Sequence, residues 1–347
     1  MLTIGESSTC RLVVKMKILC IGDPHIKWNT IPRSREMVES ILLIVKERNP
    51  DIVVVMGDTL DRFEDVKTTP LDLAVDFLDR LSQMVETFLL IGNHDYPHPS
   101  VFMDAPHPFT ALRRWQGITV VDKVVNTEIG GYKLTFVPYV ATGRFIEALD
   151  TAPGWRESRI IFGHQEIKGC KMGAITSMDG DVWDVTNPDL VLGHVHDHQR
   201  PQANVLYVGC PAQHSFGDNG LKTISLITLA EGPYHEERIG LGIKKMTLIN
   251  IEATELLQLV VPETEMLKVV VHGTIAENDA AKKLAIVGIL KAAGHKFVFK
   301  DRRDVFQARL ILDRPQVLRY GDVLYQSMET RPELQDLYRT IFGGQMK

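Results

Sequence analysis

One local pattern occurs five times in this sequence: a short apolar run ends in glycine and is followed at once by a side chain that can bind a metal ion. The five copies are KILCIGDPH (17–25), DIVVVMGD (51–58), TFLLIGNHD (87–95), RIIFGH (159–164) and DLVLGHVH (189–196). Runs without polar alternation are typical of strands buried on both faces of a sheet. Ligands of such sheets bind beyond the carboxyl ends of the strands, so the pattern predicts one site where the five glycine corners converge.

The segments between the first three runs have helical periodicity. Apolar residues share one helical face from 33 to 49 and again from 71 to 85, which indicates two strand-helix-strand crossovers. After Tyr132, shorter alternating segments predict a second, mixed or antiparallel sheet packed on the first. These segments are YKLTFVPYV, NVLYVGCPA, TISLITL and KKMTLINIE. The expected fold class is α/β, a two-sheet sandwich flanked by helices.

The length of 347 residues fits about two domains. A boundary is expected at ATELLQLVVPETE, which carries acids and a proline between strand-like segments. Beyond it we expect a strand in MLKVVVHGTI, a helix from 278 to 293, a strand pair in KFVFKDRRDVFQARLILDR and two C-terminal helices. The predicted parts are an N-terminal extension (1–15), the α/β body (16–252), a linker (253–265), a basic α+β domain (266–315) and C-terminal helices (316–347).

The net charge of −5 is unevenly distributed along the chain. Residues 281–315 have nine Lys or Arg and three Asp, a net charge of +6 that leaves −11 for the rest. A basic module attached to an acidic body could face a polyanion, although a solvated surface is the alternative. The candidate DNA contacts are Lys296, Lys300, Arg302 and Arg303.

Cysteine content and the N-terminus bear on the compartment and on the type of metal site. The sequence shows no apolar run of the ~18 residues that cross a bilayer and no signal-peptide pattern, so we expect an intracellular, cytoplasmic protein without a membrane partner. The four cysteines are too far apart for paired ligand spacing. Oxygen and nitrogen ligands are therefore expected.

Each corner alone is a weak signal, since Gly-Asp pairs are common in turns and a lone histidine is usually a hydrogen-bonded core residue. Five corners together favour a metal site, and in order they match D-x-H, G-D-x-x-D, G-N-H-D, G-H and G-H-x-H. Over residues 16–220 the chain thereby resembles the calcineurin-like metallophosphoesterase superfamily. This resemblance implies two divalent ions bridged by Asp58. The ligands implied for one ion are Asp23, His25 and His196, and those for the other are Asn93, His164 and His194.

The resemblance also implies catalytic residues. His94 would donate a proton or stabilise charge, and Asp95 would orient its ring. Nitrogen-rich ligand shells favour Mn, Fe or Zn over Mg, and Mn²⁺ is the ion that we expect. Asp61 stands where many double-strand-repair nucleases carry His, so its role stays open between a surface acid or helix cap and a functional residue. His198 is expected to be solvent-exposed or bonded to a loop, and His214 to lie at the pocket mouth.

Within the superfamily, three segments resemble SbcD-type nucleases, the catalytic subunits of the bacterial SbcCD complex, and their smaller bacteriophage and viral relatives. These segments are MKILCIGDPHIKW (16–28), GHQEIKGCKMG (163–173) and YVGCPAQHSFGDNG (207–220). The resemblance implies a DNA nuclease in double-strand break processing, recombination or replication. It also implies an SbcC-like ABC-type coiled-coil ATPase partner on the C-terminal helices, and a homodimer formed through the first two helices of the body.

Two alternatives stay open beside the nuclease. One is a phosphomonoesterase or cyclic-nucleotide phosphodiesterase, and the other is a non-catalytic DNA-binding clamp. A basic C-terminal module favours a nuclease over the first alternative, and the intact GNHD segment argues against the second. The sequence does not decide between exonuclease and endonuclease activity.

Overall fold

The computed structural model describes residues 15–63, 65–218 and 221–302, together with Leu334 and Asp336. These residues fall into two compact units. The first extends to Leu248 and includes Val260–Lys268, and the second contains Ile249–Leu259 and the chain from Val269 onward. Residues 1–14 of the predicted extension (1–15), the second strand of the predicted pair with the contact Arg303, and the predicted C-terminal helices, except for Leu334 and Asp336, lie outside the described residues. The predicted boundaries at 252 and 265 remain predictions. Among the described residues, no helix combines the length and apolarity that crossing a membrane requires.

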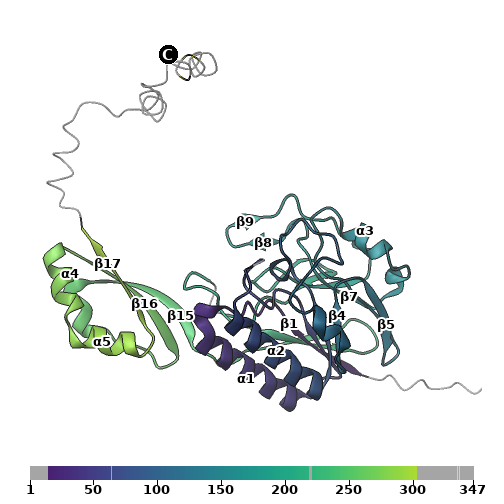
Figure 1. The fold of residues 1–347 in the computed structure, drawn as a ribbon, viewed down its shortest axis with the longest axis horizontal. Helices are drawn as coiled ribbons and strands as arrows, with labels where there is room; N and C mark the ends of the chain where they lie inside the picture. Colours follow the sequence, from purple (N-terminus) through teal and green to yellow (C-terminus); the bar gives the residue numbers. More distant parts are fainter. Residues whose placement is uncertain (1–14, 64, 219–220, 303–333, 335, 337–347) are drawn as a thin grey trace, which may run out of the picture. The chain divides into compact units, whose positions relative to one another are not determined.

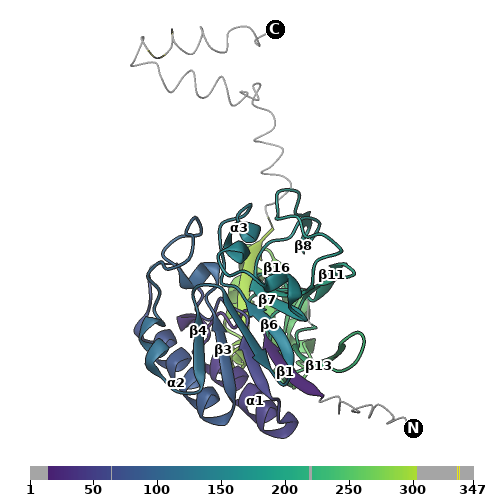
Figure 2. The same ribbon diagram turned by 90° about the vertical axis from the view of Figure 1, so that its right-hand side faces the viewer.

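The first unit contains two six-stranded sheets, and the first of these is built largely from the N-terminal part of the chain. Its parallel strands are β1 (Met16–Ile21), β2 (Ile52–Val55), β3 (Glu86–Leu90) and β4 (Ile118–Val121). Two antiparallel strands, β13 (Ile224–Leu229) and β14 (His235–Ile239), extend it beyond β1. The crossover helices α1 (Ile31–Arg48) and α2 (Thr68–Met84) lie side by side on one face (Figures 1 and 2). The predicted crossovers are confirmed.

The second sheet contains the fourth and fifth glycine corners. Its parallel strands are β6 (Tyr132–Phe136), β7 (Ile160–His164), β10 (Asp189–Gly193) and β12 (Val205–Tyr207), with β5 (Val125–Ile129) and β11 (Gln199–Gln202) antiparallel at the edges. The short helix α3 (Phe145–Asp150) and the hairpin of β8 (Lys171–Met172) and β9 (Ile175–Thr176) complete this part. The predicted α/β fold class is confirmed.

The predicted sheet membership is wrong for two segments. TISLITL forms β13 and pairs with β1 in the first sheet, where Ile18 faces Ile227. Both faces of β13 are largely buried, which suits an inner position between β1 and β14. KMTLINIE forms β15 (Lys245–Glu252) and belongs to a third sheet.

Successive side chains of β1 point into different hydrophobic layers. Ile18 and Cys20 pack between the two sheets, whereas Leu19 and Ile21 pack beneath α1 and α2. All four are fully buried, which explains why the apolar runs lack polar alternation. Between the sheets, the ring of Phe136 stacks on Phe88 with centroids 4.0 Å apart.

The second unit is a small α+β structure. The third sheet has the order β15, β16 (Glu265–Gly273) and β17 (Lys296–Asp301), accompanied by α4 (Ile275–Lys282) and α5 (Ala285–Ala292). One helix over 278–293 was expected, but the backbone at Leu284 is extended, with ψ of 133°. Ala281 and Val287 are both buried. Six residues apart, they would face different sides of one continuous helix, so the break allows both to pack inward.

In the part of the chain that the structure describes, five short 3-10 helices connect the elements. They are η1 (Trp28–Thr30), η2 (Asn93–Asp95), η3 (Thr110–Arg114), η4 (Trp155–Glu157) and η5 (Ala253–Gln258). Among them, η2 contains the GNHD segment and directly follows the end of β3. The site residues of this segment therefore lie on a single tight turn.

Phe136→Ala should reduce the free energy of unfolding of the first unit by about 3–5 kcal/mol, because it leaves a cavity between the sheets. All four tryptophans of the chain lie in this unit, so their fluorescence during urea denaturation measures its unfolding alone. Val260→Ala, at a side chain that is 84% exposed, is the control and should change stability by less than about 0.5 kcal/mol. Similar losses in both variants would contradict the two-sheet core.

Candidate metal centre

The five glycine corners converge at the carboxyl ends of β1, β2, β3, β7 and β10, three from the first sheet and two from the second. The loops approach one another more closely than larger residues allow. A Cβ atom on Gly92 would lie 2.2 Å from Oδ1 of Asp58, and one on Gly22 would lie 1.9 Å from the carbonyl oxygen of Gly209. Glycine at these corners therefore permits the contact between loops.

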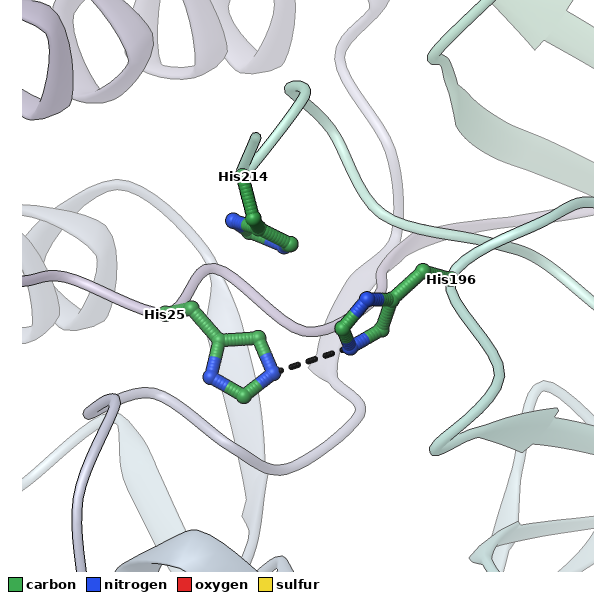
Figure 3. A group of neighbouring side chains, drawn as sticks. All are labelled: His25, His196 and His214. Carbon is green, nitrogen blue, oxygen red and sulfur yellow. Dashed lines mark hydrogen bonds between the residues drawn. The ribbon is translucent and has the colours of Figure 1, made fainter. Parts of the chain in front are cut away.

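One group of predicted ligands gathers around His25. Its Nε2 lies 3.1 Å from Nε2 of His196 (Figure 3) and 3.6 Å from Oδ2 of Asp58. Asp23, His25 and Asp58 also present ligand atoms within 4.8 Å of one another. The structure thus brings together the four residues expected around the first ion.

A second group gathers around Asn93. Its Oδ1 lies 3.0 Å from Nε2 of His164 and 2.9 Å from Nδ1 of His194. Nε2 of His164 is also 3.4 Å from Oδ2 of Asp58, so the same carboxylate oxygen approaches both groups. Nδ1 of His164 donates a hydrogen bond of 2.7 Å to the Met56 carbonyl, which leaves Nε2 available as a ligand. The arrangement suits a bridging Asp58, and the individual ligand roles stay predictions.

The charges of these groups fit divalent cations. Burial raises the pKa of Asp23 to about 7, and the negative charge of Asp58 adds to the shift. Burial lowers the pKa of His194 to about 3, so that imidazole is neutral. Burial also opposes a charge on His164, but Asp58 raises its pKa to about 9, so a cation would have to displace that proton. Once His164 has lost that proton, the crowded carboxylates and neutral imidazoles are a donor set that a divalent ion stabilises.

Four predicted ligands adopt the left-handed backbone region that is unusual for residues other than glycine: Asp23, His25, Asp58 and His194. This conformation costs roughly 1–2 kcal/mol per residue. Hydrogen bonds between the loops hold it, because the His25 N–H donates to the Asp58 carbonyl (3.0 Å) and the His194 N–H to the Asp23 carboxylate (2.9 Å). The carboxylate of Asp23, a predicted ligand, and the main-chain carbonyl of Asp58 therefore also hold the loops in place.

His94 lies beside the Asp58 carboxylate and is partly exposed. Its N–H donates to Oδ1 of Asp58 at 2.8 Å, which fixes the main chain. Its ring Nδ1 lies 2.9 Å from the carbonyl oxygen of Asp61, and the ring stacks on Phe63 with centroids 4.5 Å apart. The ring is thus oriented by the loop that follows β2.

Asp95 bonds to main-chain donors. Its carboxylate accepts hydrogen bonds from the backbone N–H groups of Thr59 (3.3 Å), Leu60 (3.1 Å) and Gly92 (3.0 Å). The short turn of η2 directs this carboxylate to main-chain donors, and the predicted orientation of the His94 ring by Asp95 stays a prediction. Asp95 thereby links the loop after β2 to the turn that contains His94. Through these bonds it holds the main chain on which His94 lies.

Two residues whose roles were left open, Asp61 and His198, now have positions. Oδ1 of Asp61 pairs with Nζ of Lys27 at 3.0 Å and lies 3.7 Å from Nδ1 of His25. His198 lies outside the cluster and is 3.0 Å from Oε1 of Glu236.

His214 is the member of the cluster that sequence reasoning left out. Its ring centroid lies 4.7 Å from that of His25 and 4.8 Å from that of His196 (Figure 3). It follows the fifth corner by 18 residues without ligand spacing. The one available signal was its position in the segment GCPAQHSFGDNG.

The predicted DNA contacts belong to the second unit, whereas the residues of the metal cluster belong to the first. Lys300 and Arg302 are exposed, and Arg302 pairs with Glu252. Up to Arg302, this unit contains six Lys or Arg and five Asp or Glu. Basic residues thus outnumber acidic ones only slightly in this part of the unit. DNA contact by these residues stays a prediction.

Comparisons with known proteins agree with this geometry. The family model of the calcineurin-like phosphoesterases matches residues 16–198. Protein 078R of Invertebrate iridescent virus 3 is 38% identical over 294 residues, 82% of this chain and 84% of its own length. Protein 244L of Invertebrate iridescent virus 6 is 38% identical over 280 residues, 78% of this chain and 99% of its own. Both are named as candidate phosphoesterases.

Among solved structures, GAP50, the anchor in the inner membrane complex of Plasmodium, is 10% identical over 65% of this chain and 85% of its own, with a TM-score of 0.39. That similarity is too low to bear on function. The family match covers the five corners and ends just beyond the last of them, and the two viral proteins match most of the chain. The chain belongs to the calcineurin-like phosphoesterase family, whose members use divalent metal ions.

Proposed function

We propose that this protein is a metal-dependent phosphodiesterase that cleaves DNA and is of the SbcD type. The observation that carries hydrolysis is the position of Asp58, whose Oδ2 lies within 3.6 Å of His25 and 3.4 Å of His164, one from each ligand group. Two divalent ions, for which we propose Mn²⁺, would supply an activated water molecule and neutralise charge on the phosphoryl oxygens. The chain itself supplies the ligands and a positioned imidazole.

His94 is suited to proton transfer at one particular atom. Because Nδ1 donates to the Asp61 carbonyl, Nε2 is the ring nitrogen that gains or loses a proton. The ring is partly exposed, so a substrate bound beside Asp58 can reach it. A protonated Nε2 would donate to the leaving oxygen or to a charged phosphoryl oxygen.

A groove beside this loop supports a polynucleotide substrate. It is lined by Trp28, Lys27, Arg62 and Lys67, and also by Asp61 and Asp65, which pair with Lys27 and Arg62. The Trp28 side chain is 56% exposed, and Nζ of Lys67 lies 4.8 Å from its ring centroid. An exposed aromatic ring among cations is the combination that stacks a base and pairs with the neighbouring phosphates. A small phosphomonoester would not need such a surface.

The proposed partners follow from the same resemblance to SbcD-type proteins. We propose that the chain forms a homodimer through α1 and α2, whose exposed apolar residues include Leu43 and Met84. We further propose an SbcC-like ABC-type ATPase as the second partner. Light scattering of the purified chain tests the dimer, and co-purification with a coexpressed ATPase subunit tests the complex.

Substrate class tests the proposal directly. The Mn²⁺-loaded protein should cleave DNA and bis-p-nitrophenyl phosphate faster than p-nitrophenyl phosphate, and Mn²⁺ should support more activity than Mg²⁺ because most of the donors are imidazoles. Rates on labelled single-stranded, double-stranded and hairpin DNA with each ion provide the measurement. Efficient monoester hydrolysis without any DNA cleavage would favour the phosphomonoesterase instead, and binding without cleavage would favour the clamp.

Substitutions at two residues that are in contact, Asp58 and His94, should affect ion binding and turnover differently. Asp58→Ala removes the carboxylate shared by both groups and should reduce bound ion to well below two per chain, whereas His94→Ala should keep both ions and slow cleavage by ~10² or more. Metal analysis after gel filtration, beside DNA cleavage rates, measures both effects. His98→Ala, an exposed histidine on the same loop, is the control and should change neither. Loss of an ion from His94→Ala, or full activity in that variant, would refute its assigned role.

Trp28→Ala should weaken binding of single-stranded DNA by about 5- to 150-fold, the effect of losing one stacked base. Hydrolysis of bis-p-nitrophenyl phosphate should be unchanged, because this substrate is too small to occupy the groove. Trp28→Phe keeps an aromatic face and should restore most of the affinity. Equal binding by wild type and Trp28→Ala would exclude the groove from substrate recognition.

A further inference from the structure

The histidine that sequence reasoning left out completes a cluster of three imidazoles from separate segments. His25 follows β1, His196 follows β10 and His214 follows β12. Their ring centroids are 4.7–4.9 Å apart and each pair is edge to face, at angles of 69–78° (Figure 3). One nitrogen of each ring lies within 4.8 Å of one nitrogen of the other two. The three side chains can therefore serve a single ion.

The backbone around His214 is held by its own turn. The N–H groups of His214 and Ser215 donate to Oδ2 of Asp218 at 2.7 and 3.1 Å. Gln213 bonds to the main chain of Met246 in both directions, at 2.6 and 2.9 Å. These bonds fix the position of His214 without using its ring.

The ring of His214 is left with an unused polar atom. Within the described part of the chain, its Nε2 is buried and has no hydrogen-bond partner. A buried polar atom without a partner costs roughly 1–3 kcal/mol, so it points to a ligand or to a solvent molecule. Beside it, Nε2 of His25 and Nε2 of His196 are 3.1 Å apart, at hydrogen-bonding distance, and a cation placed between them would take both nitrogens as ligands.

We propose that His214 is an additional ligand of the ion held by Asp23, His25, Asp58 and His196. This inference rests on the proposed metal site but not on DNA as the substrate. It makes the two ions unequal, because the first then has five protein side chains and the second has the four of Asp58, Asn93, His164 and His194. With fewer protein ligands, the second ion would be the one better able to take a phosphoryl oxygen of the substrate. A third imidazole also makes the first site more selective for ions that prefer nitrogen.

The number of histidine ligands can be counted in the full-length protein loaded with Co²⁺. With histidine labelled by ¹⁵N, each ligand ring gives a proton resonance of its N–H group that is strongly shifted by the ion. Wild type should show five such resonances, from His25, His164, His194, His196 and His214. Four resonances would overturn the proposal, and this count requires no variant to fold.

Substitution provides a second, independent readout. His214→Gln should remove one shifted resonance and weaken one of two Co²⁺ binding steps in calorimetry by about 10-fold or more, the scale on which a site responds to lost partners. His214→Asp restores an ionisable ligand and should recover part of the affinity. His198→Gln, at a histidine paired with Glu236 outside the cluster, is the matched control and should leave both measurements unchanged.

The outcomes separate this inference from the proposed function. Two bound ions with unchanged affinities and resonances in His214→Gln would show that the ring only packs against its neighbours, and would overturn the inference alone. Five shifted resonances without DNA cleavage would support the inference and reject the nuclease. A wild-type protein that binds no Co²⁺ would reject both.

Discussion

Three carboxylates, those of Asp23, Asp58 and Asp95, are buried in one cluster of loops, and the rest of the site depends on how their charge is balanced. Main-chain N–H groups provide part of the balance. Asp95 is bonded to three of them, while Asp23 and Asp58 receive those of His194 and His94. Burial still raises the pKa of Asp23 and Asp95 to about 7, so these donors do not suffice. A bound divalent cation would supply the missing charge, and it would then serve both stability and chemistry.

Local patterns in the sequence predicted where helices and strands lie better than they predicted which strands pair. The expected helices at 33–49 and 71–85 correspond to α1 and α2, and all five glycine corners lie where strands end. The pairing of β13 with β1 joins Ile18 to Ile227, and no local pattern specifies a contact across that separation. The break at Leu284 likewise depends on which side chains the third sheet buries.

The candidate site shows the same limit. Motif spacing identified the residues around Asp58, because each lies at a strand end that the fold brings to one edge. It could not indicate that the Asp95 carboxylate turns to backbone donors. It also placed His214 at the pocket mouth and not among the ligands, because the loop of His214 reaches the cluster through the pairing of β12 with β10. A single histidine without a spaced partner has no signature in sequence.

The two lines of support for a nucleic acid substrate are unequal. The basic segment was the main sequence argument, yet the second unit up to Arg302 has nearly balanced charge. The groove at Trp28 is a stronger argument, because it shares Asp61 with the loop that orients His94. Recognition and chemistry would then be linked through one short segment after β2, and a base stacked on Trp28 would place its phosphate near the reacting centre.

The close contacts at the glycine corners have a consequence for the choice of ion. The Asp58 carboxylate lies where no side chain on Gly92 would fit, and left-handed backbone at four predicted ligand positions is held by bonds between loops. Such a frame is already shaped before an ion arrives and cannot widen without breaking several of these bonds. Calcium, which prefers six to eight oxygen ligands at 2.3–2.6 Å, needs a wider and more flexible shell than these imidazoles provide. Loops held in this way would favour a small ion that accepts nitrogen ligands over calcium before any substrate binds.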